Sequence, residues 1–154
     1  MAQFNFDDVA GMQALVSEEF GPWSNAVTID QALINRFAEL SGDDYWLHTD
    51  VEKCAKYSPF KGTIAHGFLT LILLPKMRAE QPFEVVGFNN MLNVGSDRLR
   101  FTGVVPVGAQ VQSRTRLKAV EATKKGTAVT LEQHVHVVGE ARPALIYDMI
   151  FMYM

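Results

Sequence analysis

Cysteine and long apolar runs are scarce in this sequence. The 154 residues include one cysteine, Cys54, which cannot form a disulfide within the chain. A small secreted domain held by disulfides is therefore excluded, and a reducing compartment suits the sequence. The longest apolar stretch, 68–74, is far shorter than the ~20 residues that a membrane-spanning helix needs. We expect Cys54 to be inert packing, and we expect no membrane-spanning segment.

Positive charge is also in short supply. The 14 Lys and Arg residues are outnumbered by 17 Asp and Glu residues, which gives a formal net charge of −3. Nucleic-acid binders usually carry a basic face or stripe, so we expect no nucleic-acid partner. The first eight residues lack the basic and apolar regions of a signal peptide. These features predict a cytoplasmic protein without a membrane partner.

The composition and the order of the predicted elements indicate one α+β domain over residues 1–154. Hydrophobic residues make up 48% of the chain and charged residues 20%, which is ordinary for a folded protein of this length. No repeat, low-complexity tract or linker divides the sequence. Helical patterns come first and strand patterns follow, which is typical of the α+β class.

Three helices are predicted in the first half of the chain. Apolar spacing favours an amphipathic helix over 6–20 and a second over 29–40, with Thr28 and Gln31 as a capping box. The second helix should bury Ile29, Leu33, Phe37 and Leu40 and should stop at Gly42. The third helix, 67–79, is apolar on almost every side and should be buried on most of them, with a kink or an end at Pro75.

The second half is predicted to form an antiparallel sheet. Five segments have strand character: 83–94, 98–101, 109–121, 127–138 and 144–153. Inward and outward residues alternate clearly in 109–121, so one face of the sheet should be packed and the other wet. A helix that is apolar all round needs a partner that surrounds it. We therefore expect a curved sheet wrapped around 67–79.

The chemically informative residues lie in two short segments. The first, Ser-Gly-Asp-Asp-Tyr-Trp-Leu-His at 41–48, places Asp43 and His48 five residues apart in a long loop-rich excursion over 41–61. Asp50 reads as the N-cap of a short helix in that excursion. The second segment, 62–67, ends in Gly67 at the start of the apolar helix. A carboxylate and an imidazole facing a helix N-terminus suit addition or removal of water at a carbonyl-conjugated substrate.

These segments resemble the MaoC-like dehydratases, which are hot-dog-fold proteins that include the (R)-specific enoyl-CoA hydratases. The family signature reads approximately Gly-Asp-x-Asn-Pro-x-His, and Gly42, Asp43 and His48 match it. Tyr45 and Trp46 replace the Asn-Pro pair, as in a branch similar to nodulation protein N. The family's Ile-Ala-His-Gly sequence is intact at 64–67, and further similarity extends over roughly residues 20–153.

The resemblance implies a function and a set of catalytic residues. Asp43 and His48 correspond to the catalytic pair, and Gly67 corresponds to the glycine of the oxyanion hole. The implied reaction is reversible hydration of trans-2-enoyl thioesters without a metal or cofactor, since coenzyme A is part of the acyl-CoA substrate. A homodimer or a dimer of dimers is also implied. Two alternatives stay open: an acyl-CoA thioesterase, although 67–79 lacks the carboxylate common in such enzymes, and a non-catalytic acyl-thioester-binding protein.

Six further residues are candidates for substrate binding. Tyr45 and Trp46 could wall the acyl tunnel or pack in the core, and His66 is expected mainly to tie down the loop by a hydrogen bond. The other candidates border the pocket or meet the CoA phosphates: Asn93, Gly95 and Arg100. Arg98, Lys124 and Lys125 are alternative phosphate ligands or merely solvated residues.

Two histidines of one strand, His134 and His136, alternate onto the same face. Two imidazoles without a third ligand make a poor metal site. We therefore expect an exposed strand face there.

Overall fold

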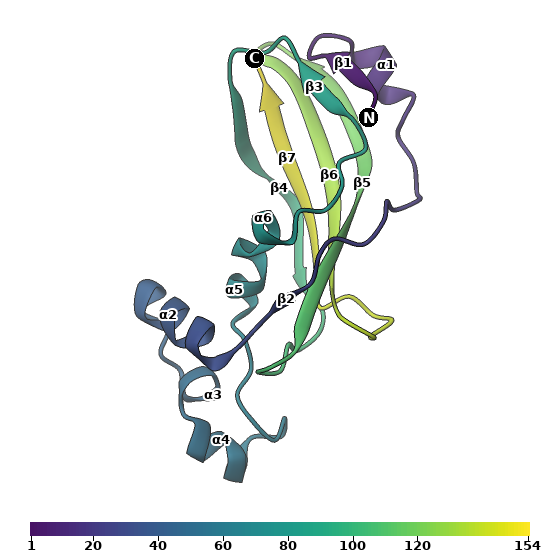
Figure 1. Ribbon diagram of the computed structural model, residues 1–154. Helices are drawn as coiled ribbons and strands as arrows, with labels where there is room; N and C mark the ends of the chain where they lie inside the picture. Colours follow the sequence, from purple (N-terminus) through teal and green to yellow (C-terminus); the bar gives the residue numbers. More distant parts are fainter.

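A computed structural model describes all 154 residues (Figure 1). A five-stranded antiparallel sheet has the order β2-β5-β6-β7-β4. Its strands are β2 (Val27–Thr28), β4 (Met91–Phe101), β5 (Gln110–Thr123), β6 (Gly126–Val137) and β7 (Leu145–Tyr153). A small parallel pair, β1 (Gln3–Asn5) and β3 (Glu84–Val86), lies near one end of the long strands.

The helices fall into two groups. α5 (Gly67–Ile72) and α6 (Leu74–Met77) pack against the curved sheet, whereas α2 (Gln31–Ser41), α3 (Trp46–Thr49) and α4 (Val51–Tyr57) gather beyond its lower end in Figure 1. The short α1 (Val9–Gln13) lies at the opposite end. None of these helices combines the length and apolarity needed to cross a bilayer. The arrangement confirms the expected α+β class.

The inner face of the sheet and the central helices form the core. Alternation along β5 is as predicted, because Val111, Ser113 and Thr115 are buried on the inner face. They lie on the face that carries the core contacts of α5 and α6, where Leu69, Leu73, Leu74 and Met77 are buried. A bulge between positions 117 and 119 then shifts the alternation along β5.

The outer face of the sheet carries charged side chains, and two of its carboxylates are shielded from solvent. Glu132 and Asp148 are almost fully buried there, and Arg98 Nη2 lies 2.6 Å from Glu132 Oε1. Burial by itself would raise the pKa of Glu132, but hydrogen bonds from His134 and Arg116 and the charge of Arg98 lower it below its ordinary value. Both carboxylates are therefore paired, as buried charges must be.

The N-terminal segment covers part of this outer face, which corrects two predictions. Helix 6–20 is wrong beyond α1, because the backbone of 17–24 instead donates three hydrogen bonds to the edge of β5. The exposed face expected at His134 and His136 is also wrong. The Phe20 ring packs at a tilt against His134 with ring centroids 4.4 Å apart, and Trp23 meets His136 edge-on at 4.9 Å.

The second predicted helix exists but begins two residues later. Its N-cap is Asp30, whose carboxylate accepts a hydrogen bond of 2.8 Å from the Leu33 N–H, so the predicted Thr28 cap is wrong. The predicted apolar face is only partly right, because Leu40 is 81% exposed and the buried positions within the helix are Ile34 and Ala38. The predicted stop at Gly42 is confirmed by its left-handed backbone, φ +77°.

The central helix is interrupted near the predicted proline. α5 ends at Ile72 and α6 restarts at Leu74, with Pro75 in the first turn, where its missing N–H costs nothing. The prediction of burial on most sides is wrong for this chain. Phe68 and Ile72 are each more than half exposed, because the sheet covers only one side of α5.

The first two predicted strands are divided differently from the prediction. β4 runs without a break through Gly95, which was expected to separate two strands. In the pairing of β4 with β7, Val94 and Asp97 have no partner residue. Each of them forms a bulge within β4, so the strand continues where the sequence predicted a turn. The actual break falls earlier, between β3 and β4.

Candidate active site

Asp43 lies in the short loop between α2 and α3. Gly42 ends α2 in a left-handed conformation and turns the chain, so that Asp43 follows directly. The Asp43 N–H donates to Ser41 Oγ over 3.2 Å, and the Asp43 carbonyl is bonded to His66 Nε2 over 2.8 Å. These two contacts hold the backbone of Asp43 from both sides and leave its carboxylate exposed.

His48 is oriented by its neighbours on both its ring and its backbone. Its Nδ1 is 2.8 Å from the carbonyl of Ile64, and a carbonyl can only accept, so Nδ1 carries the proton. Nε2 of the neutral ring therefore keeps a free lone pair. The Gln31 amide donates to the His48 carbonyl over 2.8 Å and accepts from the Thr63 hydroxyl, which joins α2, α3 and the strand-like segment before α5.

His66 contacts both members of the proposed acid–base pair, Asp43 and His48. It is 3% exposed, and burial lowers the pKa of its imidazole, so the ring is neutral near pH 7. Its Nε2–H donates to the Asp43 carbonyl, which is the loop-fastening hydrogen bond that the sequence predicts. The ring also stacks on His48, with centroids 3.8 Å apart and planes 25° from parallel.

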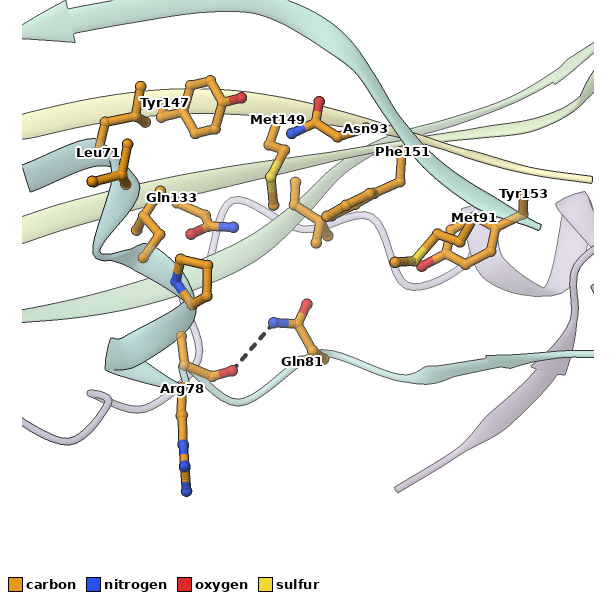
Figure 2. Close-up of a pocket in the computed structure, with 15 residues that line it drawn as sticks. Leu71, Arg78, Gln81, Met91, Asn93, Gln133, Tyr147, Met149, Phe151 and Tyr153 are labelled. Carbon is orange, nitrogen blue, oxygen red and sulfur yellow. Dashed lines mark hydrogen bonds between the residues drawn. The ribbon is translucent and has the colours of Figure 1, made fainter. Parts of the chain in front are cut away.

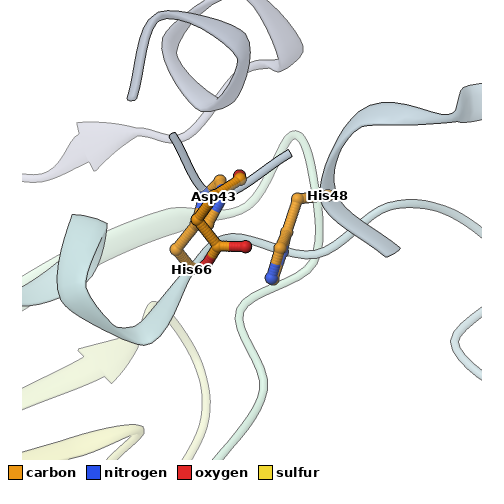
Figure 3. A group of neighbouring side chains, drawn as sticks. All are labelled: Asp43, His48 and His66. Carbon is orange, nitrogen blue, oxygen red and sulfur yellow. The ribbon is translucent and has the colours of Figure 1, made fainter. Parts of the chain in front are cut away.

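Asp43, His48 and His66 form a compact group (Figure 3). One carboxylate oxygen and one nitrogen of each ring all lie within 4.8 Å of one another. Nearly parallel stacked rings direct their lone pairs side by side instead of toward one point, which does not suit a tetrahedral ion. Two of the four ring nitrogens are also bonded to backbone carbonyls. The arrangement favours proton transfer by Asp43 and His48 over metal binding.

Gly67 begins α5 beside this group and borders a cavity of about 390 Å³ that His48, Thr70 and Phe101 also line. As the first helical residue, Gly67 has an N–H with no acceptor in its own helix. A Cβ at this position would lie 2.7 Å from Cδ1 of Phe101, so only glycine fits. The structure therefore brings His48 and a free backbone donor to one cavity, with the Asp43 carboxylate beside His48.

Tyr45 and Trp46 do not line the cavity at Gly67. Tyr45 is 54% exposed, and its ring centroid is 6.3 Å from that of His48. Trp46 faces α4, where the ammonium of Lys53 lies 4.7 Å from the ring centroid. Its carbonyl accepts a hydrogen bond of 3.3 Å from the buried Cys54 thiol. These contacts fit packing of the excursion better than a tunnel wall.

The three remaining candidates lie on β4, away from Asp43. Asn93 lines a second, larger cavity and accepts a hydrogen bond from the Gly95 N–H over 3.2 Å. Arg100 points to the face of β4 opposite to Phe101 and bonds the carbonyl of Leu99. Arg98 is engaged by Glu132 and Asp148, which makes it a poor phosphate ligand.

Sequence reasoning missed three residues that border or support the cavities: Gln31, Phe101 and Gln133. Gln31 was read only as part of a helix cap, although it fastens the backbone of His48. Phe101 sets the steric limit at Gly67, but the two are far apart in the sequence and no local pattern links them. Gln133 was also overlooked. It is polar at an inward position of β6, between Leu131 and Val135, and this break in alternation was a readable signal.

Comparison with known proteins agrees with this geometry. The profile of the MaoC like domain matches residues 17–138, which is well over half of the chain. The chain belongs to the MaoC-like family. The chain is 40% identical to 3-hydroxyacyl-thioester dehydratase Z of Mycobacterium tuberculosis over 149 residues. The aligned region covers 96% of this chain and 97% of the relative.

Two other known proteins agree with the predicted resemblance to nodulation protein N and with the predicted hot-dog fold. Nodulation protein N of Rhizobium leguminosarum bv. viciae is 36% identical over 143 residues, which are 92% of this chain and 88% of the relative. An (R)-hydratase of A. caviae involved in PHA biosynthesis superposes with a TM-score of 0.68 at 25% identity, over 88% of this chain and 97% of that one. The hot-dog fold predicted from the sequence is thus confirmed.

Proposed function

We propose that this MaoC-like protein is an (R)-specific enoyl-CoA hydratase that also catalyses the reverse dehydration of 3-hydroxyacyl-CoA. The observation that carries the proposal is that His48 and the free N–H of Gly67 border one cavity, with the Asp43 carboxylate within 4.8 Å of a ring nitrogen of His48. The 40% identity to a 3-hydroxyacyl-thioester dehydratase over nearly the whole chain supports the same reaction class.

Asp43 and His48 hold and deprotonate the water. The exposed carboxylate of Asp43 and the Nε2 lone pair of His48 each accept one O–H of a water molecule placed between them. The water oxygen then adds to the β-carbon of the enoyl thioester, and the proton that it loses is delivered to the α-carbon. A positioned acid–base group contributes about 10²–10⁴-fold to such a step.

Gly67 stabilises the charge that develops on the thioester oxygen. Its N–H lies at the start of α5, where the backbone donors face outward and favour negative charge. Loss of one oxyanion donor typically costs about 3 kcal/mol in the transition state. Protein groups alone thus supply the base, the acid and the oxyanion donor. The reaction needs no metal or organic cofactor, and coenzyme A enters with the substrate.

The test is hydration of crotonyl-CoA, followed as the loss of absorbance of the conjugated thioester. We expect Asp43→Asn and His48→Ala each to lower kcat/KM by about 10²–10⁴-fold. Asp44→Asn is the matched control, because this neighbouring carboxylate is exposed and should leave the rate unchanged. Wild-type rates in Asp43→Asn and His48→Ala would contradict the mechanism. Release of free thiol would indicate a thioesterase, and tight binding without turnover would indicate a binding protein.

The free edge of β4 supports assembly as a homodimer. β4 pairs only with β7, so its other edge is open, and Met91, Leu92 and Val94 are each about half exposed along it. Phe68 and Ile72 on α5 expose further apolar surface. Exposed edges and apolar surface of this kind are normally covered. A second copy that pairs through β4 would cover both, with a dimer of dimers as a larger form.

Light scattering on the purified protein tests this assembly. We expect at least twice the chain mass of 17.2 kDa. Val94→Lys should shift the mass toward the monomer, because it places a charge on the open edge of β4. A wild-type protein that is monomeric at micromolar concentration would contradict the dimer.

A further inference from the structure

The larger cavity, about 660 Å³, lies between the central helices and the inner face of the sheet (Figure 2). Ten of its fifteen lining residues are hydrophobic, so it suits an apolar ligand. It is lined by α5 and α6 on one side and by β4, β6 and β7 on the other. None of the three proposed catalytic residues lines this cavity, and the catalytic steps described above leave it without a role.

One row of polar side chains crosses the apolar wall of this cavity. Thr115, Gln133 and Tyr147 are directly paired across β5, β6 and β7, so they lie side by side on the inner face. The neighbouring inward row contains Leu131 and Met149, which also line the cavity. Of this polar row, Gln133 and Tyr147 line the cavity, whose other polar lining residues include Arg78, Gln81 and Asn93.

The hydrogen-bonding capacity of this row is largely unused. The Thr115 hydroxyl is buried without a partner, but Thr115 does not line this cavity. Gln133 is 5% exposed, and neither its amide nor the Tyr147 hydroxyl bonds another group of the chain. Gln133 and Tyr147 both border the cavity, so their donors and acceptors are available to a ligand.

The cavity begins one helical turn from the proposed reaction centre. Gly67 is the first residue of α5, and Leu71 and Ile72 line the larger cavity. Four residues of helix span about 6 Å. An acyl chain whose thioester oxygen sits at Gly67 would therefore enter the larger cavity after a few carbons and pass the polar row farther along.

We propose that the acyl chain of the substrate carries a neutral oxygen, a hydroxyl or a keto group, and that Gln133 is the residue that selects it, assisted by Tyr147. The inference rests on the hydratase function proposed above. An amide and a phenol can each donate and accept, which suits either oxygen. A carboxylate is disfavoured, because Arg78, the cationic residue among the lining side chains, points away from the labelled residues of the sheet in Figure 2.

The test compares trans-2-octenoyl-CoA with analogues that carry a hydroxyl at carbon 6, 7 or 8. We expect one analogue to exceed the plain substrate in kcat/KM by about tenfold or more, since a site built for a hydrogen bond discriminates against its absence. Gln133→Met keeps the side-chain length but removes the amide, and it should bring the ratio of kcat/KM for the hydroxylated analogue to kcat/KM for octenoyl-CoA down to about one. Gln110→Met is the matched control, because Gln110 is exposed at the start of β5.

Each outcome separates this inference from the proposed function. Hydration of octenoyl-CoA without preference for any hydroxylated analogue in the wild-type protein would overturn the role of Gln133 and leave the hydratase function intact. Absence of hydration with every substrate would overturn the function itself. If Gln133→Met does not fold, the wild-type preference and Tyr147→Phe decide, since Tyr147→Phe should reduce the ratio of kcat/KM for the preferred hydroxylated analogue to kcat/KM for octenoyl-CoA.

Discussion

The carbonyl of Ile64 determines which nitrogen of His48 is available for chemistry. Because Nδ1–H is bonded to that carbonyl, the proton-accepting lone pair must be on Nε2. The sequence placed Asp43 and His48 in one motif, but it could not assign the tautomer. That assignment depends on the carbonyl of Ile64, which is sixteen residues away in the sequence and which the fold places beside His48 in α3.

At Gly67, the close approach of Phe101 leads to a prediction about stability. A Cβ at position 67 would meet three ring carbons of Phe101 at 2.7–2.9 Å, so Gly67→Ala should lower the free energy of unfolding by about 1–3 kcal/mol. Urea unfolding measures this loss. The matched control is the same substitution in a Phe101→Ala background, where the clash is gone and the loss should be much smaller. An equal loss in both backgrounds would contradict the steric explanation.

At the scale of elements, α2 carries the catalytic loop at its end, and its start depends on Asp30. The Asp30 carboxylate caps the Leu33 N–H, so Asp30→Ala should destabilise the protein by about 1 kcal/mol. Thermal or urea unfolding measures the change. Asp7→Ala is the control, since Asp7 is an exposed aspartate that makes no capping bond, and it should be nearly neutral. A similar loss in both variants would show that charge, not capping, is responsible.

The elements that the sequence predicted well are those determined by local rules. The Gly42 stop, the Asp50 cap and the alternation of β5 each follow from a few neighbouring residues. Helix 6–20 failed because tertiary hydrogen bonds to the edge of β5 outcompeted a local apolar pattern. The burial of α5 was overestimated because apolarity on all sides does not reveal which neighbour covers each side.

The same distinction applies to the site across the whole molecule. Asp43, His48 and Gly67 were predicted because each belongs to a compact motif. The sequence shows that Gln133 is polar at an inward position, but the row that it forms with Thr115 and Tyr147 depends on the register of three strands, which no local pattern gives. The charged outer face was also hidden, since its carboxylates lie on different strands.

Two buried histidines, His66 and His136, and the partly buried His134 predict that the whole molecule loses stability in acid. Burial is the largest cause that lowers the pKa of His66, His134 and His136 below the ordinary value. The unfolded chain therefore takes up protons near pH 6.5 that the folded chain does not, so stability falls as the pH drops below about 6.5. At lower pH the depressed pKa of Glu132 adds to the loss, because its ion pairs vanish when it is protonated.

Urea midpoints at pH 8, 7, 6 and 5 test this dependence. We expect similar midpoints at and above neutrality and a progressive decrease below pH 6.5. His134→Gln should flatten the decrease, since it removes one of the three groups. Equal wild-type midpoints at pH 8 and pH 5 would contradict the argument.

The burial of Cys54 has a practical consequence for the motion of the catalytic excursion. Its thiol is fully shielded and is fastened to the carbonyl of Trp46, two residues before His48. Burial also raises the pKa of this thiol, which suppresses the reactive thiolate. Because the chain has no other cysteine, the rate of its alkylation reports how often α4 separates from α3. The alkylation rate of Cys54 is therefore a direct measure of how often the excursion that carries His48 opens.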